Sequence, residues 1–332
     1  MAKVATNGTA LTGELEGLVR ETYLLWEPGW VNFNWRGYTY DHVQRVRGLA
    51  HTLCLREGGD PRVVELAALL HDITKAYDGD YVLDAAGKRA VDANGYWQND
   101  VRPPVGGNEV TRLFDRLGLA GQLHSDSGAR VAYELLRARG VDEPLAAAVA
   151  RTIQDHLRPP EDASVESRCL YDADTVDANI GLPAFVRNIY IHLHFRDERK
   201  RPDEAPTDLL LRDAPLDYLG PYVCDRLPTW SAGKRTDFIP KLLTGAAVEV
   251  AERRLVRLER AWACFRAELD EFPLASARGC LAAVLYLMRH REEPSIDENV
   301  AYLANGWLHE GPRTPEVAAL VRDLAAEVRG IE

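Results

Sequence analysis

The chain has 332 residues, of which 46% are hydrophobic, enough to bury the core of two average domains or of one domain with a large extension. Its formal net charge of −11 argues against general affinity for a nucleic-acid backbone, although a local basic pocket could still bind a small phosphorylated molecule. We therefore expect a small substrate and not a nucleic-acid polymer. The five cysteines are odd in number, far apart and without a CxxC pair, which indicates neither a disulfide framework nor a sulfur-rich zinc site.

The sequence predicts a cytoplasmic protein with no membrane partner. The first residues, MAKVATNGTALTGELEG, lack the apolar core of a signal peptide. The longest comparable apolar run, GCLAAVLYLM after Arg278, has only ten residues and is too short to span a bilayer. A reducing cytosol also suits the unpaired cysteines. The sequence leaves open whether the chain acts alone or as a homodimer.

Helical periodicity dominates the first half of the chain. Apolar residues recur at three- and four-residue spacing over five segments: residues 11–25, 39–57, 61–76, 124–139 and 142–157. Pro61 marks the start of one helix, and Pro159-Pro160 follows the end of another. No segment shows the sustained alternation of apolar and polar residues that is typical of a β-strand. The pattern therefore predicts an all-α fold.

Two irregular segments interrupt the helices. Residues 78–107 are rich in Gly, Asp, Asn and Pro, which favours either a surface insertion with a short hairpin or a lid over an active site. A second irregular stretch covers residues 197–240, with helix returning at about 241. We place a domain boundary near residue 182. This gives a domain over residues 11–181 and a helical extension over 182–332 that packs on it.

The dipeptide His71-Asp72, at the end of the apolar run LAALL, is the most informative motif of the chain. Four more side chains able to bind divalent metals lie in other segments: His42, His124, His156 and Asp174. Nitrogen and oxygen donors without thiolate favour Mn, Fe, Co or Ni, so we expect one or two ions of this kind.

The spacing of these residues suggests how two ions would be shared. If the segment is one helix, His71 and Asp72 diverge by about 100° yet can reach one metal, which His42 and Asp174 would complete. His124 and His156 would hold a second metal, and Asp72 would bridge the two. Ions placed in this way lower the pKa of bound water and neutralise a phosphoryl group during in-line attack. Lys75, about one helical turn after Asp72, would contact a phosphate oxygen, which makes Asp72 and Lys75 the candidate catalytic residues.

Five elements in this order resemble the HD superfamily of metal-dependent phosphohydrolases: HVQRV at His42, LLHDITK, HSDSGA at 124–129, His156 and YDADTVDA at 171–178. The resemblance covers about residues 36–181. It implies an all-α helical bundle with His42, His71, Asp72 and Asp174 on one metal, and His124, His156 and the bridging Asp72 on the other. It also implies that Lys75 contacts phosphate. Within the superfamily, the two additional histidines and HDxxK resemble the two-metal branches.

Three points stay open after this comparison of motifs. Asp172 rivals Asp174 as a ligand, and the family pattern, which places the ligand after the alanine, favours Asp174. The insertion at 78–107 is longer than in the small dinucleotide hydrolases of the superfamily, and its Trp97 could stack on a base while Arg89 and Arg102 reach phosphate. The GYP motif of some relatives is absent, so the substrate, which we expect to be nucleotide-like, is not fixed.

Two other functions are compatible with the same residues. Myo-inositol oxygenase and a phosphonate-cleaving relative carry a similar set of ligands, and there two irons activate dioxygen instead of water. A non-catalytic HD protein that only binds a ligand is the other alternative, although the intact set of candidate ligands argues against it. Metal identity and oxygen uptake would separate the oxygenase from the hydrolase.

Overall fold

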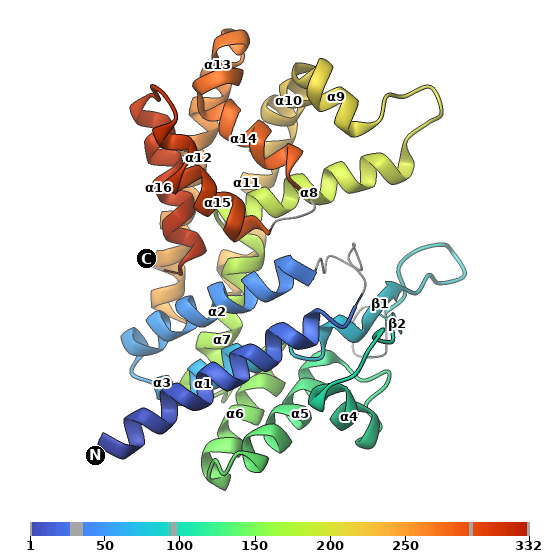
Figure 1. Cartoon of the computed structure of the whole chain (residues 1–332), viewed down its shortest axis with the longest axis vertical. Helices are drawn as coiled ribbons and strands as arrows, with labels where there is room; N and C mark the ends of the chain where they lie inside the picture. Colours follow the sequence, from blue (N-terminus) through green and yellow to red (C-terminus); the bar gives the residue numbers. More distant parts are fainter. Residues whose placement is uncertain (1, 27–35, 92, 94–97, 292–294, 331–332) are drawn as a thin grey trace. The chain divides into compact units, whose positions relative to one another are not determined.

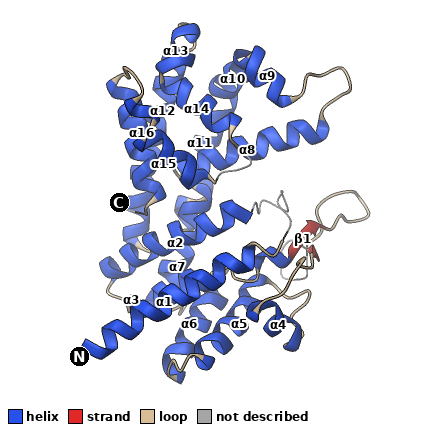
Figure 2. Cartoon of the chain, in the orientation of Figure 1, coloured by secondary structure: helices blue, strands red, loops and turns tan. Residues whose placement is uncertain are grey.

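The structure is a computed structural model that describes residues 2–26, 36–91, 93, 98–291 and 295–330, and these residues are mostly helical (Figures 1 and 2). The chain divides into two compact units, Met1–Tyr171 and Asp172–Glu332. The all-α class predicted from periodicity is confirmed. The division falls within one helix, ten residues before the boundary expected near residue 182, and the extents of the domains stay a prediction.

Unit 1 contains helices before and after a small antiparallel sheet. Its elements are α1 (Ala2–Tyr23), α2 (Arg36–Glu57), α3 (Pro61–Leu70), a 3₁₀ helix (Lys75–Tyr77), β1 (Asp78–Tyr81), β2 (Asn99–Val101), α4 (Glu109–Arg116), α5 (His124–Ala138), α6 (Glu143–Asp155) and the first part of α7 (Val165–Asn179).

Helix α3 is the central element of unit 1. Asp60 caps its N-terminus by accepting a hydrogen bond from the Arg62 amide, and Pro61 occupies the first turn, where no amide hydrogen is needed. All residues of α3 from 63 to 70 except Glu65 are buried. The helix packs against α1, α2, α5 and α6, because its apolar residues cover nearly its whole circumference. Its C-terminal end therefore delivers His71 and Asp72 into the interior.

The predicted helix over residues 61–76 is wrong in its last part. Helix α3 ends at Leu70, a turn follows, and a 3₁₀ helix covers Lys75–Tyr77. The Lys75 amide donates to the carbonyl of Asp72, three residues back, and the Tyr23 hydroxyl donates to the same carbonyl at 2.7 Å. Apolar spacing does not distinguish such a tightened turn from an α-helical one. The relative direction of His71 and Asp72 is thus set by the turn and not by α-helical geometry.

The insertion at 78–107 contains the short hairpin expected as one of its two interpretations. Asp78 on β1 pairs with Val101 on β2, and Tyr81 pairs with Asn99, with an irregular register between them. Gly79 allows the close approach of the strands, because a Cβ there would lie 2.6 Å from the carbonyl oxygen of Asp100. The hairpin starts at the residue that follows the 3₁₀ helix, so its first strand is anchored beside Asp72.

Unit 2 is helical in the part that the structure describes. Its elements are the end of α7, α8 (Leu182–Arg199), α9 (Thr207–Asp213), α10 (Pro215–Pro221), a π-helical turn (Tyr222–Arg226), α11 (Leu227–Asp237), a 3₁₀ helix (Ile239–Lys241), α12 (Gly245–Glu268), α13 (Phe272–Arg278), α14 (Cys280–Arg289), α15 (Ile296–Asn305), a 3₁₀ helix (Trp307–His309) and α16 (Pro315–Val328).

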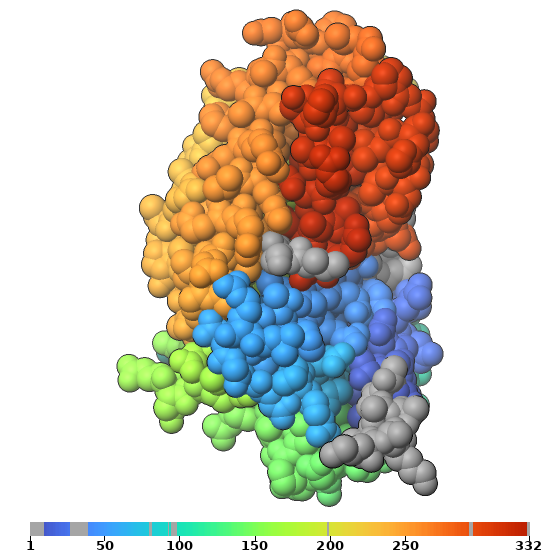
Figure 3. Space-filling model, turned by 90° about the vertical axis from the view of Figure 1, so that its left-hand side faces the viewer, coloured from blue at the N-terminus to red at the C-terminus, as the bar shows by residue number. Residues whose placement is uncertain are grey.

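The irregular stretch expected at residues 197–240 is largely helical, which corrects the prediction. Pro215 is the first residue of α10 and Pro228 is the second residue of α11, and proline in the first turn is compatible with the start of a helix. The run GCLAAVLYLM forms α14, a buried core helix of unit 2. Within the described ranges, no helix combines the length and apolarity needed to cross a bilayer. Figure 3 shows the outer faces of α12 (orange) and of the last helices (red) next to one another in this unit.

Candidate metal centre

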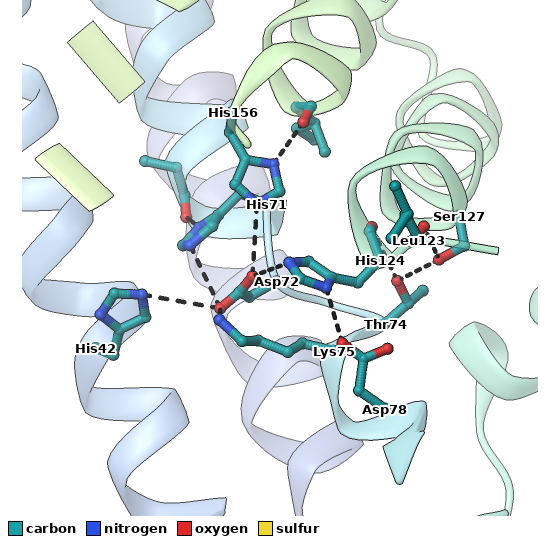
Figure 4. Close-up of polar contacts among 12 residues, drawn as sticks. His42, His71, Asp72, Thr74, Lys75, Asp78, Leu123, His124, Ser127 and His156 are labelled. Atoms are coloured by element: carbon teal, nitrogen blue, oxygen red, sulfur yellow. Dashed lines mark hydrogen bonds and ion pairs between the residues drawn. The ribbon is translucent and has the colours of Figure 1, made fainter. Parts of the chain in front are cut away.

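The carboxylate of Asp72 is fully buried and lies at the centre of a cluster of imidazole rings (Figure 4). The Nε2 atoms of His42 and His71 lie 3.8 and 3.5 Å from its Oδ2 atom. The Nε2 atoms of His124 and His156 lie 3.5 and 3.8 Å from its Oδ1 atom. Each carboxylate oxygen thus faces a different pair of histidines, and the four rings come from α2, the end of α3, α5 and the end of α6.

The rings of His71, His156 and His124 are oriented by a hydrogen bond at the nitrogen opposite the one that faces Asp72. His71 Nδ1 lies 2.7 Å from the carbonyl oxygen of Ala68, and His156 Nδ1 lies 2.6 Å from that of Ile153. A carbonyl oxygen only accepts, so Nδ1 carries a proton in both rings, and in the neutral form of each ring the lone pair of Nε2 points toward Asp72. His124 Nδ1 lies 2.9 Å from Asp78 Oδ2. This is the arrangement in which an outer hydrogen bond fixes the tautomer and direction of a metal-binding histidine.

The residues of this cluster fit divalent metal ions. Asp72 Oδ1 and His124 Nε2 are buried and make no hydrogen bond within the part of the chain that the structure describes. An unsatisfied buried polar atom is costly unless another group occupies the site. Two groups have donor atoms that lie within 4.8 Å of one another, His42–His71–Asp72 and Asp72–His124–His156, and they share Asp72. Imidazole and carboxylate donors suit Mn, Fe, Co or Ni.

The charge of Asp72 is strongly favoured by its surroundings. Burial by itself would raise the pKa of Asp72, but His71 and Lys75, followed by His124 and His42, hold this pKa well below its usual range. Burial would lower the pKa of His124, yet its hydrogen bond to Asp78 and the charge of Asp72 raise it above the ordinary value. An ionised carboxylate at this position provides the negative charge that a cation site needs.

Lys75 reaches the same carboxylate from the solvent side. Its Nζ atom lies 2.7 Å from Asp72 Oδ2, and its side chain is 24% exposed. The side chain therefore extends from the buried cluster to the surface. The sequence placed Lys75 beside Asp72 correctly, although the intervening backbone is a turn and not an α-helix.

Sequence reasoning missed the residues that support the cluster. Asp78 was read only as the start of the insertion, although its carboxylate holds His124. Thr74 Oγ1 donates to the carbonyl oxygen of His124 and lies 2.8 Å from Ser127 Oγ, which ties the turn after Asp72 to α5. Gly128 permits this approach, since a Cβ there would lie 3.1 Å from the carbonyl oxygen of His71. The HSDSG run could have indicated this contact, because small residues one turn after a metal-binding histidine allow another segment to pack closely against the helix.

The two aspartates of YDAD differ in what their carboxylates do. Asp172 accepts hydrogen bonds from the Leu243 amide, the Thr244 amide and the Thr244 hydroxyl at 2.8, 2.8 and 2.7 Å. It therefore holds the N-terminal cap of α12, which gives it a structural role in unit 2. Asp174 also belongs to unit 2, whereas the four histidines lie in unit 1. Its assignment as a metal ligand stays a prediction.

A cavity of about 300 Å³ is lined by residues of the hairpin and by residues around the start of α5. Its walls include Asp78, Gln98 and Asn99 from the insertion, and also Thr74 and Ser127. Because Asp78 lines the cavity and also holds His124, the insertion adjoins the cluster. This position is compatible with a lid.

The residues of the insertion that were predicted to bind substrate are placed only in part. The Arg89 guanidinium donates to Asn99 Oδ1 at 3.0 Å, across the hairpin. Arg102 joins the hairpin to the rest of unit 1 through its backbone, as its amide donates to Tyr77 and its carbonyl accepts from the Trp26 indole. Trp97 lies outside the described residues. The roles of all three in binding stay predictions.

Residues 39–179 match the family model of the HD domain. The chain carries an HD domain. The match runs from α2 to the end of α7 and includes every candidate ligand, so the resemblance inferred from the motifs is confirmed. The match assigns an HD domain to these residues and specifies neither the reaction nor the substrate.

Solved structures show further similarity to the chain. A predicted HD superfamily hydrolase from an uncultured Thermotogales bacterium is 20% identical, with 80% of this chain and 92% of that chain covered and a TM-score of 0.39. YpgQ from Bacillus subtilis is 17% identical, with 80% and 95% covered and a TM-score of 0.41. Because these scores are below 0.5, the assignment of the HD domain rests on the match of residues 39–179. A comparison with curated proteins returns no match.

Proposed function

We propose that the HD domain hydrolyses a phosphate ester or anhydride of a small, nucleotide-like molecule in the cytoplasm, with two divalent metal ions. The observation that carries this proposal is the buried carboxylate of Asp72, whose two oxygens face two different pairs of histidines. A carboxylate in this position can serve two cations at once. Two cations close together are suited to stabilise the attacking and leaving oxygens of phosphoryl transfer.

The ligands of the two ions follow from the two groups of donor atoms. His42, His71 and Asp72 Oδ2 would hold the first ion, with Asp174 as the proposed fourth ligand, and His124, His156 and Asp72 Oδ1 would hold the second. Ions at these positions would lower the pKa of water and neutralise charge on a phosphoryl group. The protein itself fixes the direction of the rings through Ala68, Ile153 and Asp78.

The position of Lys75 supports the proposal that the substrate is phosphorylated. Its ammonium lies at the edge of the cluster, is partly exposed and is already drawn to the site by Asp72. An ammonium in this position would donate to a phosphate oxygen and shield its charge as the substrate approaches. The burial of the cluster strengthens this interaction, because charges attract more strongly where water is excluded.

The insertion supplies the proposed substrate specificity. Its hairpin begins at Asp78 and forms part of the wall of the cavity that adjoins His124. We expect the insertion to close over the substrate and to use Trp97, Arg89 and Arg102 for base and phosphate contacts. A lid of this kind would complete the pocket only after the substrate has entered.

A phosphate-release screen tests the proposed reaction. Anaerobically purified protein is analysed for Mn, Fe, Co and Ni, loaded with each, and incubated with a panel of nucleotides and sugar phosphates. We expect release from a nucleotide-like substrate that disappears in Asp72→Ala. The matched control is Asp115→Ala, a change at an exposed aspartate of α4 that should leave the rate unchanged.

Two outcomes would overturn the proposed hydrolase. Consumption of dioxygen by the iron-loaded protein, without phosphate release, would identify an oxygenase similar to myo-inositol oxygenase. Tight nucleotide binding without turnover under all metal conditions would identify a ligand-binding HD protein. Both results are measured on the same preparations.

A further inference from the structure

Three side chains in unit 2 form a second cluster, outside the HD cluster and unused by the proposed reaction. They are Cys264 and Glu268 at the C-terminal end of α12, and Cys280 at the first position of α14. The two sulfur atoms lie 2.7 Å apart, although fifteen residues, including helix α13, separate the cysteines in the sequence. The pair was not foreseen from the sequence, where the cysteines were expected to be isolated.

Glu268 holds the two helix ends in this arrangement. Its Oε1 atom accepts a hydrogen bond from the Cys280 amide and its Oε2 atom accepts one from the Leu281 amide, both at 2.8 Å. The carboxylate thereby caps the N-terminus of α14, where amides lack partners within the helix. The Cys264 thiol lies 3.4 Å from the same Oε1 atom. The short distance between the sulfurs is thus supported by the packing of two helices and not by a loose loop.

The distance between the sulfurs favours a covalent bond over a shared metal. Two thiolates on one tetrahedral zinc ion, each about 2.3 Å from it, would lie about 3.8 Å apart. The observed 2.7 Å is much closer to the roughly 2.05 Å of a disulfide. Both oxygens of Glu268 are also engaged by amides.

We propose that Cys264 and Cys280 form a reversible disulfide when the protein meets a small-molecule disulfide such as oxidised glutathione. The thiolate of Cys264 attacks one glutathione sulfur, and the first glutathione leaves as its thiol. The Cys280 sulfur then attacks the Cys264 sulfur of the mixed disulfide, and the second glutathione leaves. Two protein thiols lose two electrons and two protons, and one glutathione disulfide becomes two thiols.

The order of the two steps follows from exposure. Cys264 is partly accessible, whereas Cys280 is buried, so the oxidant reaches Cys264 first. The hydrogen bond with Cys264, followed by burial, raises the pKa of the Cys280 thiol, which keeps Cys280 protonated while Cys264 is reduced. Once Cys264 carries glutathione, that hydrogen bond is gone and Cys280 is the nearest nucleophile. The pair therefore has one attacking and one resolving cysteine.

Thiol mapping of the full-length protein tests the proposal. Reduced protein is treated with oxidised glutathione, quenched by acid, alkylated, digested and analysed by mass spectrometry. We expect a linked peptide pair of Cys264 and Cys280 at least tenfold more abundant than glutathione on Cys264. Cys280→Ser should instead trap glutathione on Cys264, and Cys264→Ser should leave Cys280 as a free thiol. The matched control is Cys224→Ser, which removes an exposed cysteine of unit 2 and should leave the linked pair unchanged.

A second measurement remains informative if a serine variant fails to fold. The oxidised wild-type protein should melt about 5 °C or more above the reduced protein, because the bond closes a loop in the unfolded chain. Either of two results on the wild-type protein would overturn the proposal: glutathione that persists on Cys264, or thiols that both remain free. Zinc that binds the reduced protein at these cysteines and blocks their alkylation would also overturn it and identify a metal site.

Discussion

Asp72 in unit 1 and Asp172 in unit 2 are both fully buried aspartates, and their surroundings differ in kind. The oxygens of Asp172 accept hydrogen bonds from two amides and a hydroxyl at 2.7 to 2.8 Å. The oxygens of Asp72 face four imidazole nitrogens at 3.5 to 3.8 Å, and Lys75 is the close charged neighbour. Burial alone therefore does not mark a functional carboxylate. The distinguishing feature is whether nearby groups satisfy it by hydrogen bonds or surround it with donors for a cation.

The difference also separates two uses of negative charge. Asp172 stabilises the start of α12 through groups that are already part of the fold. The carboxylate of Asp72 faces four imidazole rings, which come from α2, the end of α3, α5 and the end of α6. A structural aspartate should affect folding when removed, and a metal-binding aspartate should affect metal content and turnover.

The largest effect is expected for Asp72→Ala. The change removes the carboxylate shared by both groups of donors, so metal content should fall from about two ions per chain to less than one. Phosphate release should fall about a thousandfold or more, since charge stabilisation by the ions accounts for several kcal/mol. Metal analysis and initial rates measure both effects. A variant with full metal content would show that Asp72 is as structural as Asp172.

A smaller effect is expected for Lys75→Met, which keeps the length of the side chain and removes its charge. The rate should fall about ten- to a hundredfold, as expected for the loss of one charged donor worth about 1.5 to 3 kcal/mol. Metal content should stay intact, because Lys75 is a neighbour of Asp72 and not a ligand. An unaltered rate on the true substrate would show that Lys75 does not contact the phosphate and only neutralises the charge of Asp72.

Asp78→Ala tests whether the outer hydrogen bond to His124 matters. Affinity for the second ion should fall by about tenfold or more, with the first ion retained, because loss of such a partner typically weakens metal binding ten- to a hundredfold. The matched control is Asp84→Ala, an exposed carboxylate of the same insertion that accepts hydrogen bonds from the backbone amides of Ala86 and Lys88. Metal titration of both variants decides the question. Equal affinities would mean that His124 is held by other contacts.

Shortening residues 84–100 to a Gly-Ser linker tests the insertion as a lid. The KM for the true substrate should rise roughly tenfold, since loss of one stacked base costs about 1 to 3 kcal/mol. The KM for a generic aryl phosphate should change little, and the metal should remain bound. Steady-state kinetics on both substrates give the comparison. Equal losses on the two would assign the insertion to packing or assembly.

The smallest effect on the metal centre is expected for Asp172→Ala, the counterpart of the first experiment. Metal content per folded chain should be unchanged. The melting temperature should fall by roughly 5 °C, because about 1 to 3 kcal/mol is lost when buried donors lose their acceptor. Calorimetry and metal analysis on the same sample test both statements. Loss of metal at full stability would make Asp172, and not Asp174, the better candidate ligand.

The helical class and the histidine cluster were predictable because they depend on local pattern and on motif order. Periodicity located α2, α5 and α6, and the order of motifs selected His42, His71, Asp72, His124 and His156. The end of α3 at Leu70 was not predictable, since a turn stabilised by the distant Tyr23 hydroxyl leaves the apolar spacing unchanged. The local sequence indicates local geometry, but it does not show hydrogen-bond partners that are distant in the sequence, such as Tyr23.

The contacts that sequence reasoning missed are all made between distant segments. Asp78 holds His124 across 46 residues, and Cys264 meets Cys280 across a whole helix. The stretch 197–240 was predicted to be irregular, yet Pro215 and Pro228 lie in the first turns of helices α10 and α11. A proline is compatible with the first turn of a helix and disrupts its interior. The sequence alone does not show which residues before or after the proline are helical.

The most direct test of the two-metal account is anomalous diffraction from crystals of anaerobically purified, Mn-loaded protein. The account predicts two peaks, one on each side of the Asp72 carboxylate, each at bonding distance of about 2.1 Å from the histidines that face it. His42 and His71 should contact one peak, and His124 and His156 should contact the other. A single peak, or none with Lys75 still paired to Asp72, would contradict the account.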